Sequence, residues 1–147
     1  MTKTIKHGMA GVLCAALTAF LLIGTSTAQV TKGKKQPLKT AQWMKGVVKP
    51  HCTALKEGLA GVPKTDTAWD ELALNAAILN ETSHVLMSDG RCPDGTWAKA
   101  ASKTLRSGSA GVLKAIEARD VEAARTAFKQ LTQSCAACHK AHKPKKK

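Results

Sequence analysis

The sequence predicts an all-α protein, an antiparallel up-down four-helix bundle, and three observations carry that prediction. The chain of 147 residues has no tyrosine and few runs of β-branched residues, whereas alanine, lysine and leucine are abundant, which is a helix-rich composition. Apolar residues recur at alternating steps of three and four, so they form a stripe along one face of each helix. The connections between these stripes are short, which favours antiparallel neighbours.

The first predicted helix begins near Leu38 and runs to Gly61-Val62-Pro63. It contains Pro50, which lacks a backbone donor and whose ring clashes with the carbonyl four residues earlier. That earlier residue is Gly46. The pair therefore predicts either a kink or a break of this helix into two pieces.

The other three helices have clearer limits. Asp66 or Thr67 can cap the second, because their side-chain oxygens accept hydrogen bonds from free backbone amides, and Ser88-Asp89-Gly90 ends it. The third follows Pro93-Asp94-Gly95, and Asp120 can cap the fourth. Their stripes are Trp69, Leu72, Ala76, Leu79, Ser83 and Leu86; Trp97, Ala101, Leu105, Gly108, Val112 and Ile116; and Val121, Ala124, Phe128, Leu131, Cys135 and Cys138.

The N-terminus has the layout of a cleaved secretory signal, which we assign to residues 1–28. Lys3 and Lys6 precede an uncharged, mostly apolar run over 9–24, and Ser26-Thr27-Ala28 offers the small residues that a signal peptidase reads. The run is short for a bilayer span, and an uncleaved anchor is the alternative. We therefore expect a periplasmic or otherwise exported protein with no stable membrane insertion after cleavage.

The predicted mature chain is strongly basic. Removal of the signal, which contains two lysines and no acidic residue, lowers the formal net charge from +13 to +11. Such a field favours acidic protein partners. Part of the charge lies in a basic flexible segment over 29–37 and a basic tail over 143–147, which flank a helical domain over 38–142. Nucleic-acid binding is not expected, because aromatic residues are scarce and no recognition module is visible.

Cys135-Ala136-Ala137-Cys138-His139 is the stretch with the clearest chemistry. Two thiols at this spacing can add to the two vinyl groups of one porphyrin, and the adjacent imidazole can bind the iron. The motif continues the apolar stripe of the last predicted helix, so the haem would lie in the core of the bundle. A redox dithiol and a zinc site with one further ligand are the alternatives.

With this motif near the end of a fourth helix, the chain resembles the class II c-type cytochromes, the cytochrome c-prime and cytochrome c-556 group. The resemblance covers roughly residues 38–142. It implies one covalently attached haem c, with Cys135 and Cys138 as its thioethers and His139 as the proximal iron ligand. It also implies a homodimer in many members. We expect no enzymatic activity.

The sixth iron position separates two functions. In the c-556 type a methionine of the first helix binds the iron, and Met44 lies near that family position, although Thr40 replaces the arginine that often stands one turn earlier. Iron between histidine and methionine is suited to electron transfer, which is the function we expect. If Met44 is only a core residue, the iron is five-coordinate, as in the c-prime type, and binds nitric oxide or carbon monoxide. Weaker ligand candidates are His51, His84, Met87 and His142.

Cys52 and Cys92 are predicted to form a disulfide. Export permits disulfides, and these two cysteines remain after the motif takes its pair. The bridge would stabilise the fold by about 2–4 kcal/mol if its geometry allows. Two free buried thiols are the alternative.

Overall fold

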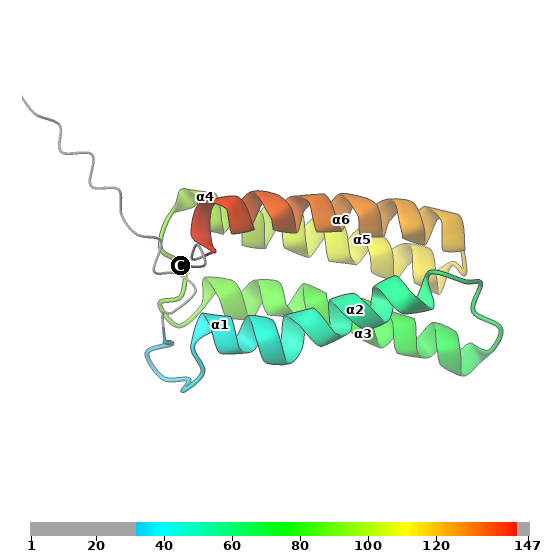
Figure 1. The fold of residues 1–147 in the computed structure, drawn as a ribbon, viewed down its shortest axis with the longest axis horizontal. Coiled ribbons are helices and arrows are strands. Elements are labelled where there is room, and N and C mark those ends of the chain that lie inside the picture. The colour runs from blue at the N-terminus through cyan, green and yellow to red at the C-terminus, as the bar shows by residue number, and fades with distance from the viewer. Residues whose placement is uncertain (1–31, 144–147) are drawn as a thin grey trace, which may run out of the picture.

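The computed structural model describes residues 32–143, so the predicted signal peptide lies outside the described residues, as does most of the predicted tail. Regular structure in 32–143 is helical, apart from one isolated β-bridge between Lys32 and Lys39. Four helical stretches follow one another (Figure 1), which confirms the all-α prediction. They are α1 (Thr40–Trp43), π-helix η2 (Met44–Val48) and α2 (Lys49–Gly58); α3 (Asp66–Met87); α4 (Gly95–Ala98), π-helix η3 (Lys99–Leu105) and α5 (Arg106–Glu117); and α6 (Val121–His142).

The stretches lie side by side, and their termini gather at two opposite ends of the molecule (Figure 1). One end, called here the α4 end, holds the start of α1, the end of α3, α4 and the end of α6. The other, called the far end, holds the end of α2, the start of α3, the end of α5 and the start of α6. Helix α3 contacts α2 and α5, and α5 contacts α6.

The core is made largely of the residues in the predicted stripes. All six stripe residues of α3 are buried, and the third and fourth stretches add Trp97, Ala101, Leu105, Val112, Ile116, Ala124 and Leu131. Each large apolar side chain contributes about 1.5–3 kcal/mol when it leaves water. The first stretch contributes less, since Leu55 and Leu59 are its only buried large apolar residues and Leu38 is 40% exposed.

Side-chain caps set the start of three helices. Thr65 caps α3 by accepting a hydrogen bond from the Ala68 amide at 3.2 Å, so the predicted cap at Asp66 or Thr67 is wrong, because Asp66 is already helical. Asp120 caps α6 as predicted, accepting from the Ala123 amide at 2.9 Å. Asp94 caps α4 in the same way.

The first stretch neither ends nor breaks at Pro50. Gly46 lies in η2, and Pro50 lies in the first turn of α2, directly after that π-helix. Pro50 lacks the backbone amide that would donate into the preceding turn, and in this continuous helix the preceding turn is the π-helix η2. A change of helix type therefore takes the place of the predicted break.

The segment before α1 is held by Asp89, which follows α3. The amides of Lys35 and Gln36 donate to the Asp89 carboxylate at 2.8 and 3.0 Å, and the Lys34 amide donates to its backbone carbonyl at 3.0 Å. These hydrogen bonds, chiefly that from Gln36, lower the pKa of the Asp89 carboxyl. The part of the predicted flexible segment that the structure describes is therefore a bound loop.

No helix within 32–143 is both long enough and apolar enough to cross a membrane.

Candidate cofactor pocket

An apolar pocket opens at the α4 end, between the first stretch, the third stretch and α6. It has about 490 Å³ of empty space, its open mouth included. Its walls are Met44 and Val48 from η2, Leu86 from α3, Trp97 from α4, Ala100, Ala101 and Leu105 from η3, and Cys135, Cys138 and His139 from α6. The pocket thus brings the predicted attachment motif and Met44 together.

Both π-helices described in this chain border the pocket. η2 supplies Met44 and Val48, and η3 supplies three of the apolar wall residues. A π-helix hydrogen-bonds from residue i to i+5, occurs mostly as a short bulge inside an α-helix, and is frequent at functional sites. The backbone irregularity of this fold is therefore concentrated where the pocket forms.

The pocket thiols are kept protonated. Burial is the main cause that raises the pKa of Cys135 to about 11, and the neighbouring Cys52 and Cys138 thiols raise it further. Burial also raises the pKa of Cys138, with a smaller effect from the Asp94 carboxylate. Redox dithiols and thiolate metal ligands have lowered pKa values, so this environment does not favour the redox-dithiol alternative.

His139 lies in the α6 wall, although its side chain is partly exposed. Burial of the imidazole, and then the positive charge of Lys143, lower its pKa. A lowered pKa favours the uncharged ring, which is the form that binds a metal. A matching second imidazole does not line the pocket.

Trp97 fixes the base of the pocket. Its indole nitrogen donates to the Leu86 carbonyl at 2.8 Å, and its ring meets the ring of His142 edge-on, with centroids 5.2 Å apart. His142 is buried and lies 3.5 Å from the Asp94 carboxylate. The His142 side chain is thus part of the packing that joins α3, α4 and α6, a contact between distant segments that no local sequence pattern predicts.

The other weak ligand candidates lie outside the pocket walls. His51 is hydrogen-bonded to Asn75 at 2.7 Å, and His84 to Arg106 at 3.2 Å. Met87 is half-buried but does not line the pocket. Among the sulfur and imidazole groups proposed as distal ligands, only Met44 lines the walls.

The predicted disulfide between Cys52 and Cys92 is not formed, because both are free thiols. Cys52 on α2 is a neighbour of Cys135, whose pKa it raises. Cys92 lies in the loop before α4, and its thiol donates to the Asp94 carbonyl at 3.5 Å. The two thiols thus have different surroundings, which sequence position alone did not reveal.

The donor set of the pocket fits a haem better than a zinc ion. No group of three or more histidine, cysteine, aspartate or glutamate side chains within 32–143 is arranged to hold a metal ion. A haem needs fewer side-chain ligands, because the porphyrin nitrogens supply most of the iron coordination, and its faces suit apolar walls. Two thiols one helical turn apart, with an imidazole beside them, match that requirement.

No protein-family model matches the chain, and no curated protein or solved structure matches it either. The pocket residues themselves therefore carry the functional proposal.

Proposed function

We propose that this protein is an exported monohaem c-type cytochrome that transfers electrons, with its iron bound by His139 and Met44. The observation that supports this most strongly is the shared pocket, which Cys135, Cys138 and His139 line from α6 and Met44 lines from η2. The chain would then be an antiparallel up-down bundle with its haem near the end of the last helix, as its resemblance to the class II c-type cytochromes implies. The gathering of helix termini at two ends (Figure 1) agrees with that arrangement.

Each pocket residue has a separate task in this proposal. Cys135 and Cys138 hold the cofactor through thioether bonds, and the neutral imidazole of His139 is the proximal ligand. The thioether of Met44 would supply a second protein ligand to the iron. When bound, the haem supplies a one-electron redox centre, and a methionine opposite histidine raises its potential. Leu86, Leu105 and Trp97 keep water away from it.

The charge of the chain suggests the class of redox partner. The net charge of +11 that remains after removal of the predicted signal favours proteins with an acidic surface. Attraction between exposed charges is screened by salt, with a Debye length of about 8 Å at physiological ionic strength. Electron exchange with an acidic partner should therefore slow as salt is added.

The first test is covalent haem attachment. The full chain, made in cells with the haem-attachment machinery, should keep its haem after denaturation. Replacing both Cys135 and Cys138 with serine should abolish this, because no thioether can form. Cys92→Ser is the matched control and should keep the haem, since Cys92 is not a pocket residue. A wild-type chain without covalent haem would reject the proposal.

The second test asks whether Met44 binds the iron. The wild-type absorption spectrum should be low-spin and insensitive to carbon monoxide, and Met44→Ala should make it high-spin and responsive. Met87→Ala, a control outside the pocket walls, should leave the spectrum unchanged. A wild-type spectrum that is already high-spin and shifts with carbon monoxide would replace electron transfer with gas binding.

A further inference from the structure

Arg91 is a buried cation without a hydrogen-bond partner. The residue is 1% exposed, and its Nε, Nη1 and Nη2 atoms are all buried and form no hydrogen bond. It is the only buried lysine or arginine among the residues that the structure describes. A buried charge that is neither paired nor hydrogen-bonded is costly. The position therefore calls for an anion.

Arg91 lies at the α4 end of the bundle, in the same connection that links two of the pocket's walls. It belongs to the loop between α3 and α4, with the pocket residues Leu86 before it and Trp97 after it. The hydrogen bond from the Trp97 indole to the Leu86 carbonyl, at 2.8 Å, closes the base of this loop. The loop that carries Arg91 thus connects two helices that each supply one residue to the pocket wall.

The loop over 32–39 covers the guanidinium group. A Cβ atom on Gly33 would lie 2.8 Å from Nη2 of Arg91 and would collide with the Asp89 carboxylate, so a larger residue there would force these side chains to move. The same loop leads directly into α1 and then to Met44. Arg91 is therefore enclosed between the α3–α4 loop and the segment that leads to the η2 wall of the pocket.

The nearest acidic side chain does not satisfy Arg91. The Asp89 carboxylate accepts hydrogen bonds from the amides of Lys35 and Gln36, and none of the guanidinium nitrogens bonds to it. The positive charge of Arg91 also helps to lower the pKa of Asp89, after the hydrogen bonds from Gln36 and Lys35. The carboxylate that Asp89 offers is thus already used to hold the covering loop.

We propose that Arg91 is the receptor for a carboxylate of the cofactor, one of the two haem propionates. This inference rests on the proposed function. A haem has apolar faces but carries two carboxylates on one edge, and the pocket walls contain no lysine or arginine that could pair with them. A guanidinium fork matches a carboxylate with two parallel hydrogen bonds. Binding would give Arg91 its missing partner and would orient the haem edge toward the α3–α4 loop.

The propionate pKa values of the holoprotein test this pairing. With haem labelled by ¹³C at the propionates, NMR titration of the wild type should show one carboxyl with a pKa lowered by about 1–3 units, as expected beside an arginine. Arg91→Gln should abolish that shift, a tenfold or greater rise in proton affinity, and Arg91→Lys should keep part of it. Arg119→Gln is the control, because Arg119 is exposed at the far end and pairs with Asp66.

The charged groups around the loop, Lys34, Asp89, Asp94 and His142, are the same in every variant, so a difference reports on Arg91 alone. An unchanged propionate pKa in Arg91→Gln would overturn the inference while leaving the cytochrome intact. A wild-type chain without covalent haem would overturn both.

A crystal structure of the wild-type holoprotein covers the case in which Arg91→Gln fails to fold. It should show a propionate oxygen about 2.7–2.9 Å from a guanidinium nitrogen of Arg91. A free inorganic anion at Arg91, with both propionates elsewhere, would reject the assignment.

Discussion

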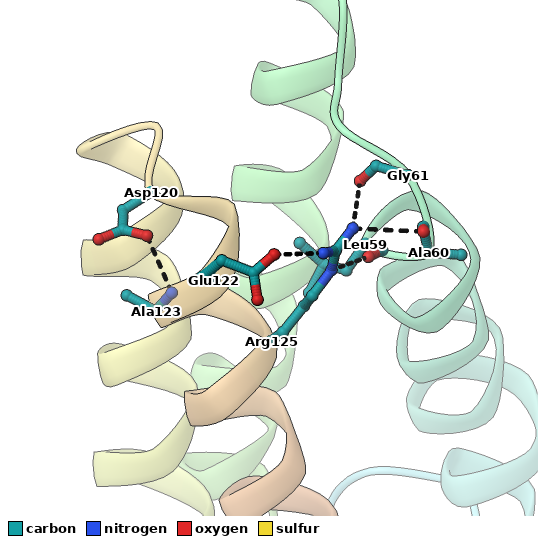
Figure 2. Close-up of polar contacts among 7 residues, drawn as sticks. All are labelled: Leu59, Ala60, Gly61, Asp120, Glu122, Ala123 and Arg125. Atoms are coloured by element: carbon teal, nitrogen blue, oxygen red, sulfur yellow. Dashed lines mark hydrogen bonds and ion pairs between the residues drawn. The ribbon is translucent and has the colours of Figure 1, made fainter.

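Each end of the bundle has one arginine packed into it, and the two differ in their hydrogen bonding. At the far end, Arg125 of α6 donates from Nε to the Leu59 carbonyl at 2.7 Å, donates from Nη2 to the carbonyls of Ala60 and Gly61 at 3.2 Å each, and pairs with Glu122 (Figure 2). The last carbonyls of a helix lack intrahelical donors, so Arg125 caps the end of α2. At the α4 end, Arg91 is more deeply buried and has no hydrogen bond.

The two ends therefore differ in whether their polar side chains have hydrogen-bond partners within the chain. Polar groups at the far end satisfy one another, as also in the cap that Asp120 provides for Ala123 (Figure 2). The α4 end combines an apolar pocket, two π-helices and an unsatisfied guanidinium. Unsatisfied groups reduce the stability of a chain by itself, so their concentration at one end points to a ligand there.

The largest expected effect tests whether the α4 end is packed as firmly as the far end. Trp97→Ala should lower the free energy of unfolding by about 3–5 kcal/mol, because a large buried ring leaves a cavity. Ile116→Ala, at an equally buried site nearer the far end, should cost about 2–5 kcal/mol. Urea denaturation followed by circular dichroism measures both. A cost below about 1 kcal/mol for Trp97→Ala would contradict a formed pocket base.

The second prediction is that replacing an arginine changes the free energy of unfolding in opposite directions at the two ends. Arg125→Met should destabilise the haem-free chain by about 1–3 kcal/mol, because the carbonyls of Leu59, Ala60 and Gly61 that follow α2 lose their donor. Arg91→Met should stabilise the same haem-free chain by about 1–4 kcal/mol, because it replaces an unpaired buried charge with an apolar side chain of similar length. Equal losses of stability in both variants, measured by urea denaturation, would contradict the proposed difference between the two ends.

The smallest effect concerns Asp89, which holds the covering loop, and it depends on pH. Its pKa is lowered in the folded state, so the unfolded chain binds the proton more readily. The stability that Asp89 contributes is fully present above the ordinary value of 3.8 and is lost as pH falls through the lower folded value. Asp89→Asn should therefore be less stable than wild type at pH 6.

That difference should shrink as both proteins are unfolded by urea at decreasing pH below 4. Asparagine keeps a side-chain acceptor and tolerates the positive φ of 58° at this position, so the variant isolates the charge. Asp66→Asn, which breaks an exposed ion pair at the far end, should change stability little at any pH. A difference between wild type and Asp89→Asn that stays constant from pH 6 to pH 3 would contradict the role of the charge.

The sequence predicted the parts of the fold that depend on local periodicity. The stripe from Trp69 to Leu86 is buried throughout, because a spacing of three and four residues fixes one face of an α-helix whatever surrounds it. The cap at Asp120 depends only on its own side chain and the next few amides. The motif at 135–139 and Met44 meet in one pocket, although the ligation of iron by these residues stays a prediction.

Features that depend on contacts between distant segments could not be predicted. Arg91 is buried because the loop around Gly33 folds over it, and no local pattern marks that contact. The pairing of Cys52 with Cys92 was wrong because counting cysteines says nothing about distance, and Cys52 has Cys135 as its neighbour. The two π-helices were not predicted either. Whether a helical segment forms i to i+5 hydrogen bonds depends on its packing against neighbouring helices and not on local periodicity.

The π-helix η3 makes the position of the pocket base depend on a single residue of chain length. A π-helix holds one more residue than an α-helix of the same hydrogen-bonded span, so one residue removed from 99–105 would return the third stretch to continuous α-helix. Each residue of an α-helix turns the chain by about 100°, and Trp97 would rotate by that amount relative to Val112 and Ile116. A single codon lost here would turn the pocket base away from the core while leaving every residue of the attachment motif in place.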